Sequence, residues 1–94
     1  MSREPVIDSS GNVFADLGFS AEESTLLAMR AELMTRLRDT IKQRGWTQQE
    51  AAEKLGIGQS RVSDLMRGKW ERFSLDMLIT LITRTGQHVE LVVG

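Results

Sequence analysis

Four polar side chains share one face of a predicted helix and carry groups suited to recognising a ligand. They are Gln59, Ser60, Ser63 and Asp64, in a helix expected over Gln59–Arg67 whose opposite side carries Val62, Leu65 and Met66. In the major groove of DNA, a glutamine amide can bond adenine at two points, a serine hydroxyl can bond either base type, and a carboxylate can accept from cytosine N4. The spacing therefore favours a face that reads base edges, and the alternative is an ordinary solvated helix face.

Cationic side chains lie in and beside the same segment. We expect phosphate contacts, which supply most of the affinity for DNA and its salt dependence, from Arg61, Arg67, Lys69 and Arg72. Gln48 is a fifth candidate, because it begins the preceding helix, where backbone N–H groups and the helix dipole favour a phosphate. The simpler alternatives are surface charge for the cations and a polar first-turn residue for Gln48.

Two short helices joined by a glycine turn are predicted over Gln48–Arg67. Thr47 and Glu50 have the spacing of a capping box at the start of the first helix. Gly56 follows that helix, at a position where left-handed backbone is common. The inward face of the first helix is small and apolar, and consists of Ala51, Ala52 and Leu55. A pair of helices built in this way is the arrangement that places its second helix in the major groove.

These residues resemble the Cro/phage-repressor (XRE) class of helix-turn-helix proteins over about Arg36–Arg84. The shared marks are Thr47-Gln48, Ala52, Gly56, Val62, Leu65 and Arg67-Gly68-Lys69. The flanks, NVFADLGFSAEES and FSLDMLITLITRTGQHVELVV, extend the resemblance to HigA-like antitoxins over about Asn12–Val93. The resemblance implies a DNA-binding repressor in which Gln59, Ser60 and Asp64 read bases. It also implies that Gln48 clamps a phosphate or supports the recognition helix.

The rest of the chain predicts a mainly α fold, a bundle of four to five helices with a short C-terminal β-strand. Residues 1–11 are expected to be a mobile tail, and residues 12–94 a single domain. A long helix should begin at Ser20 and end near Arg44-Gly45. A further helix should begin at Ser74 and end at Thr85-Gly86, before a strand over Gln87–Val93.

A single strand needs a partner for its backbone groups. Two partners are open to the strand at Gln87–Val93: the Val13–Leu17 segment, or the same strand of a second subunit. Repressors of this class commonly bind as dimers, to half-sites about one helical turn apart. We therefore expect a homodimer that this strand helps to build.

Charge is distributed unevenly along the 94 residues, although the formal net charge is only −1. Residues 1–34 carry two basic and six acidic side chains, and residues 35–72 carry nine basic and five acidic ones. The positive region therefore coincides with the proposed DNA-binding unit, and the acidic region would suit a basic protein partner. The chain has no cysteine, membrane-length apolar run or signal-peptide pattern, so we expect a cytoplasmic protein without disulfides.

No set of residues indicates an enzyme, a metal site or a cofactor site. His88 is the one histidine and has no chelating neighbour in the sequence, so a surface position on the strand is expected. Phosphate-binding loops, nucleophile motifs and paired catalytic carboxylates are missing from the sequence.

Two functions are consistent with this sequence. The first is a sequence-specific repressor that binds a double-stranded DNA operator and regulates its own operon. The second is an inhibitor of a cognate, RNA-cleaving toxin, for which DNA binding is secondary. A third possibility is that the helix pair is only a scaffold for protein contacts.

Overall fold

Capping boxes fix the start of two helices in the computed structural model, which describes residues 6–8 and 18–93. Ser20 accepts a hydrogen bond from the Glu23 N–H at 3.1 Å and precedes α2 (Ala21–Gln43). Thr47 accepts one from the Glu50 N–H at 3.1 Å and precedes α3 (Gln48–Leu55). These bonds satisfy N–H groups that the first turn of a helix leaves unpaired, so both helices begin where the sequence predicts.

The remaining helices follow the same chain order as the sequence predicts. Helix α4 (Gln59–Met66) comes after Gly58, which supplies no side-chain cap. A single 3₁₀ turn, η1 (Trp70–Arg72), leads into α5 (Leu75–Arg84), whose start is capped by Ser74. The predicted fold class is therefore confirmed: the described chain is mainly helical, with four α-helices and a short C-terminal strand.

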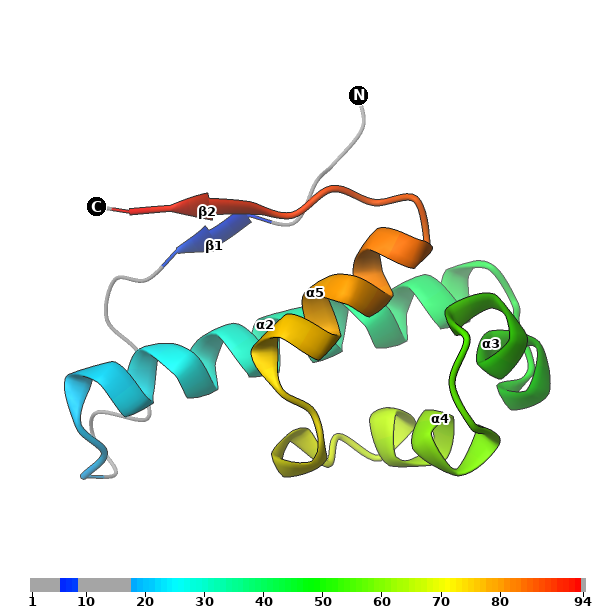
Figure 1. Cartoon of the computed structure of the whole chain (residues 1–94), viewed down its shortest axis with the longest axis horizontal. Coiled ribbons are helices and arrows are strands. Elements are labelled where there is room, and N and C mark those ends of the chain that lie inside the picture. The colour runs from blue at the N-terminus through cyan, green and yellow to red at the C-terminus, as the bar shows by residue number, and fades with distance from the viewer. Residues whose placement is uncertain (1–5, 9–17, 94) are drawn as a thin grey trace.

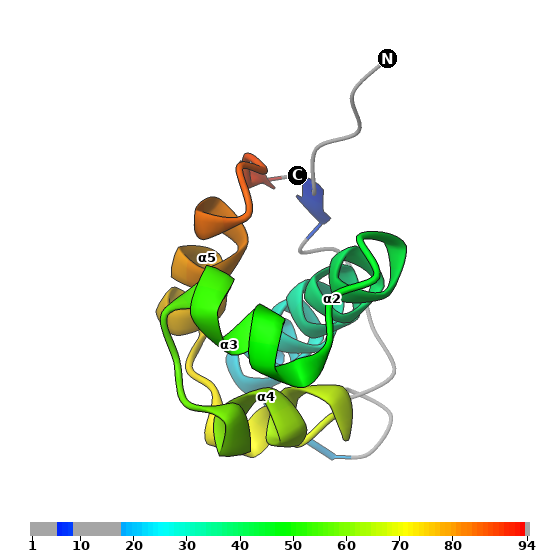
Figure 2. The ribbon, with the colours of Figure 1, turned by 90° about the vertical axis from the view of Figure 1, so that its right-hand side faces the viewer.

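The core lies where α5 crosses α2 and where α3 and α4 close the other side (Figures 1 and 2). Each helix contributes apolar side chains at helical spacing, and Phe73 adds a ring from the loop between η1 and α5. The side chains with almost no exposed surface are Leu33, Leu37, Leu55, Val62, Leu65, Phe73, Leu78, Leu81 and Ile82. Burial of these groups stabilises the arrangement of the helices and holds α4 in a fixed orientation.

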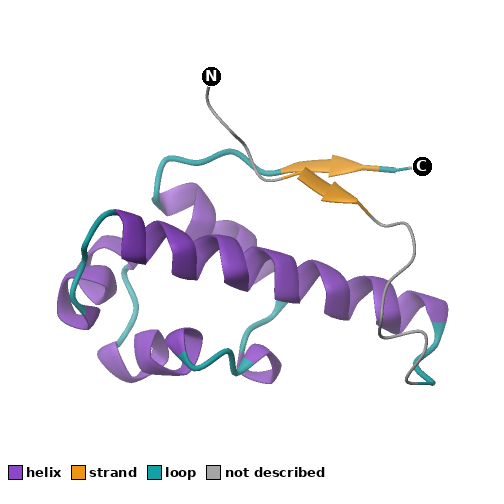
Figure 3. Ribbon diagram, turned by 180° about the vertical axis from the view of Figure 1, so that it is seen from behind, coloured by secondary structure: helices purple, strands orange, loops and turns teal. Residues whose placement is uncertain are grey.

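The strand pairing differs from both partners that the sequence suggested. Strand β2 (Glu90–Val92) pairs in parallel with β1 (Val6–Asp8), in the register Ile7 to Leu91. Val6–Asp8 falls inside the segment expected to be a mobile tail. The Val13–Leu17 segment lies outside the described residues. Backbone groups of β2 thus find a partner within the same chain, because the segment after α5 runs back alongside α2 (Figures 1 and 3).

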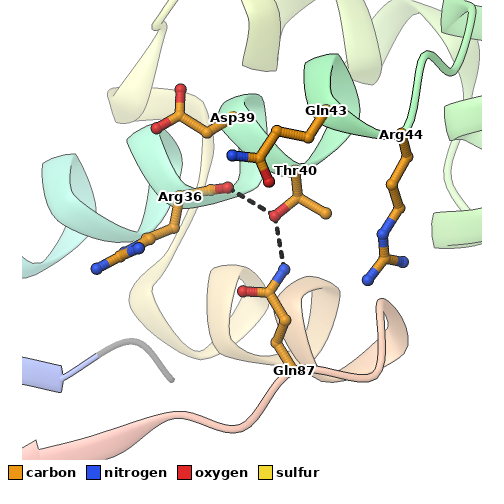
Figure 4. Close-up of a pocket in the computed structure, with 6 residues that line it drawn as sticks. All are labelled: Arg36, Asp39, Thr40, Gln43, Arg44 and Gln87. Carbon is orange, nitrogen blue, oxygen red and sulfur yellow. Dashed lines mark hydrogen bonds between the residues drawn. The ribbon is translucent and has the colours of Figure 1, made fainter. Parts of the chain in front are cut away.

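Gln87 was predicted to begin the strand, but it lies outside β2 and its side chain bonds to α2. Its Nε2 donates to Thr40 Oγ1 at 2.6 Å, and that hydroxyl donates to the Arg36 carbonyl at 2.9 Å (Figure 4). Together with Asp39, Gln43 and Arg44, these residues line a polar hollow of about 440 Å³. This contact anchors the segment that leads to β2, and the strand itself spans Glu90–Val92, the three residues that pair with β1.

Candidate nucleic-acid interface

The turn between α3 and α4 is held by backbone geometry and by α5. Gly56 has φ 70° and ψ 35°, in the left-handed region, and its N–H donates to the Ala52 carbonyl at 2.8 Å. Arg84 Nη1 donates to the Leu55 carbonyl at 2.6 Å, and a Cβ on Gly56 would lie 3.2 Å from the same nitrogen. A side chain at position 56 would therefore be strained and would also press on this bond.

The two helices of the motif pack through small and branched apolar side chains. Ala51 and Leu55 of α3 are fully buried against Val62 and Leu65 of α4. Ile57 in the turn is half-buried and packs on the same cluster. One side of α4 is thereby committed to the core, so its other side has to face away from the protein.

The N-terminal end of α4 carries the most accessible of the predicted base-reading residues. Gln59 and Ser60 are both exposed, while Ser63, one turn further on, is half-buried. Figures 1 and 2 show α4 on the side of the helices opposite to the strands, where neither strand covers it. A duplex could therefore approach this end of α4 without displacing another described element.

Asp64, the fourth predicted base reader, is paired with cations of the same chain. Its carboxylate lies 3.8 Å from Lys69 Nζ and 3.9 Å from Arg72 Nε, and its side chain is only 19% exposed. The structure thus brings Asp64 together with two residues predicted to bind phosphate. These contacts hold both cations next to the C-terminal end of α4, and they reduce the net positive charge there.

Arg61 is occupied by contacts inside the protein. Its Nη1 donates to the Arg72 carbonyl and its Nη2 to Met77 Sδ, both at 3.3 Å. Its guanidinium also lies 5.3 Å from the centre of the Phe73 ring, within the range of a cation–π interaction. These contacts join α4 to η1 and α5, so Arg61 stabilises the position of α4 relative to the core.

Arg67 and Gln48 lie at helix ends and are both exposed. Gln48 is the first residue of α3, where the Glu50 carboxylate also lies, 2.9 Å from the Thr47 N–H. Hydrogen bonds from the Thr47 backbone and then from its hydroxyl lower the pKa of Glu50, so this carboxylate stays charged. A negative charge at the same helix end opposes a phosphate beside Gln48, which the sequence reading did not consider.

The sequence reading did not assign a role to Arg38, which lies beside the end of α4. Its Nη1 is 3.4 Å from the position that a Cβ on Gly68 would occupy, and Gly68 has φ 74°. Among the described residues, the buried Nε of Arg38 has no hydrogen-bond partner. One feature of the sequence could have indicated this placement: Arg38 directly follows Leu37, a residue of the buried stripe of the long helix.

Comparison with known proteins identifies the family. The model of a family described as "helix-turn-helix domain" matches residues 13–94, which is most of the chain. No curated protein matches the chain.

Two other kinds of feature are absent from the part of the chain that the structure describes. None of its helices has the length and apolar character of a membrane span. The described residues also contain no cluster of three or more metal-binding side chains.

Proposed function

Because the chain belongs to the helix-turn-helix domain family, whose fold supports a DNA-binding regulator, we propose that it is a sequence-specific repressor. In this proposal α4 enters the major groove of an operator. The main observation in support of the proposal is that α4 is amphipathic. Its Val62 and Leu65 side chains are buried. Gln59 and Ser60, at its N-terminal end, are exposed. The resemblance to the Cro-type class supports the same role.

The proposed contacts divide into base readers and phosphate binders. Gln59 and Ser60 read base edges, with Ser63 placed for contacts further along the groove. Arg67, Lys69 and Arg72 bind phosphates through their charge, and Gln48 bonds a phosphate through its neutral amide despite the nearby Glu50 carboxylate. These contacts position the helix without specifying sequence. Arg61 holds α4 in place from within the protein, and Asp64 restrains Lys69 and Arg72 and so limits their contact with phosphate.

Selection of DNA from a random pool tests this proposal and identifies the operator. Replacement Gln59→Ala should relax the preference at one operator position, at a cost of about 1–3 kcal/mol in binding. The matched control is Gln43→Ala, because Gln43 is also an exposed glutamine and lies on α2 rather than α4. A selected pool with no shared sequence, or an operator affinity that Gln59→Ala leaves unchanged, would contradict the proposal.

The repressor is proposed to bind as a homodimer through β2. In the two-stranded sheet of the described chain, β2 has one edge without a strand beside it, and the Leu91 and Val93 side chains are 59% and 78% exposed. Short two-stranded sheets are marginally stable, so pairing with β2 of a second copy would stabilise both. Sedimentation equilibrium tests this contact, and a monomer at micromolar concentration would count against it.

An antitoxin role is a second candidate, favoured by the acidic N-terminal region and by the resemblance to HigA-like proteins. Residues 1–34 carry a net charge of −4, which suits a basic, RNA-cleaving toxin. The test is co-expression with the product of any small basic reading frame beside this gene. A complex that blocks RNA cleavage would support the role, and separate purification of the two proteins would contradict it.

A further inference from the structure

A leucine of the core-facing stripe of α2 lies outside the bundle. Leu26 is 46% exposed, although it shares a helix face with Leu33 and Leu37, seven and eleven residues further on, which are fully buried. The reason is visible in Figures 1 and 3, where the N-terminal turns of α2 extend past the other helices. The apolar stripe continues on this extension, without the helices that cover it elsewhere.

Hollows lie on both sides of Leu26. One of about 260 Å³ is lined by Phe19, Glu23, Leu26, Leu27, Arg30 and Trp70. The other is lined by Ala21, Glu22, Thr25 and Leu26. Leu26 therefore stands as a ridge between two depressions, the shape that allows one helix to receive a side chain from another.

Charged side chains flank Leu26 in a self-complementary order. Glu23 precedes it by three residues and Arg30 follows it by four. In two antiparallel helices related by a two-fold axis at Leu26, these side chains lie about 4.5 Å and about 6 Å from the axis along the helix. Glu23 of each copy then lies beside Arg30 of the other, so one surface provides both halves of two ion pairs.

Arg30 is without a carboxylate partner in its own chain, as far as the described residues extend. Its Nε is buried and has no hydrogen-bond partner, and no described acidic side chain is within ion-pair distance. Glu23 accepts a hydrogen bond from the Ser20 N–H at 3.3 Å through one carboxylate oxygen, which leaves the second oxygen for another donor. The Arg30 residue as a whole is half-buried, so a second copy could supply a carboxylate to the accessible part of its guanidinium and a cation to Glu23.

We infer that the surface formed by Glu23, Leu26 and Arg30 is a two-fold contact between two copies of this chain. Leu26 of each copy meets Leu26 of the other on the axis, and one Glu23–Arg30 pair lies on each side of it along the helices. This contact is separate from the β2 edge and does not depend on the repressor proposal. Where both contacts form, the helix contact joins two dimers.

Charge reversal with rescue tests the contact. Glu23→Arg and Arg30→Glu should each weaken self-association about tenfold, since both place like charges opposite each other twice per contact. An equimolar mixture should restore association, because each variant meets its complement in the other. Native mass spectrometry of one isotope-labelled and one unlabelled variant resolves the mixed assemblies. The helix contact appears as mixed dimers if the β2 edge forms no contact, and as tetramers that contain both variants if it does.

Two controls distinguish loss of this contact from loss of the fold. Circular dichroism should show that both variants stay mainly helical. Glu23→Arg loses the bond from the Ser20 N–H, but the Ser20 hydroxyl still caps the backbone N–H of residue 23. Leu26→Ala should weaken association, while Ile79→Ala, at an exposed apolar position on α5, should not. Wild-type chains that do not associate, or a mixture no stronger than either variant alone, would overturn the inference and leave this surface to another partner.

Discussion

Replacement of Asp64 by asparagine should strengthen binding to DNA of any sequence. The carboxylate lies within 3.9 Å of cationic groups on both Lys69 and Arg72, and the pairs hold these side chains against the protein. Asparagine has nearly the same shape, so the backbone of α4 is expected to remain in place. The replacement removes a charge that repels phosphate and releases two cations to contact it.

The size of this effect follows from elementary electrostatics. A carboxylate about 8 Å from a phosphate opposes binding by about 0.5 kcal/mol in bulk water and by about 2 kcal/mol at an effective dielectric constant of about 20. Affinity should therefore rise by about 2-fold to about 30-fold. If Lys69 and Arg72 each gain one phosphate contact, the slope of log affinity against log salt should steepen by up to about 1.8. The fold should lose under about 1 kcal/mol per ion pair, because both partners of Asp64 are partly exposed.

Fluorescence anisotropy with the selected operator and with a random duplex, each over a range of salt, distinguishes two roles of Asp64. If Asp64 restrains the cations, both affinities should rise by the same factor. If it reads cytosine, operator affinity should fall while the affinity for random DNA rises. Asp39→Asn, at an exposed carboxylate of α2, controls for the change in net charge. Unchanged affinity and salt slope for the random duplex would refute the inference that Asp64 restrains Lys69 and Arg72.

Three further changes test how the motif is held together. Gly56→Ala should lower the free energy of unfolding by about 1–3 kcal/mol in urea titrations, because φ is 70° and Arg84 lies against the added carbon. Arg61→Ala should lower it by about 1–2 kcal/mol through lost contacts with Phe73 and Met77, and a neutral result would leave Arg61 free for phosphate. Glu50→Gln should flatten the dependence of stability on pH. The bonds from Thr47 that lower the pKa of Glu50 stabilise the fold above its ordinary pKa of 4.5, and this stability is lost as the pH falls through the lowered value. Urea midpoints between about pH 3 and about pH 6 should fall more steeply in the wild type than in the variant, which keeps the lowered pKa of Asp76.

The helices could be predicted because their signals are local. The capping box at Thr47 and Glu50 spans four residues, and the left-handed glycine at position 56 directly follows the helix it ends. Burial of Val62 and Leu65 follows from their spacing on one helix face. None of these features needs knowledge of what lies elsewhere in the chain.

The strand pairing could not be predicted in the same way. Ile7 pairs with Leu91 across almost the whole chain, and three-residue strands carry little pattern of their own. The bond from Gln87 to Thr40 likewise joins residues far apart in the sequence. Such contacts depend on how α5 directs the chain that follows it.

At the interface, the sequence predicted which side chains lie on the exposed end of α4. It did not predict which of the polar side chains contact each other. Sequence spacing places Gln59 and Ser60 on an exposed end of α4, as the structure does. Arg61 and Asp64 are separated from this group by the contacts they make with η1, Lys69 and Met77, which only the folded chain brings near. The roles of all these residues in DNA binding stay predictions.

Photocrosslinking from α4 is the most direct measurement of whether this helix enters DNA. A p-benzoylphenylalanine in place of Ser60 should crosslink to bases of the operator, and an excess of unlabelled operator should suppress the product. The same group in place of Thr83, exposed on α5, should give no crosslink to bases. Absence of a crosslink from position 60 while the protein still binds the operator, or equal crosslinking from both positions, would contradict major-groove binding by α4.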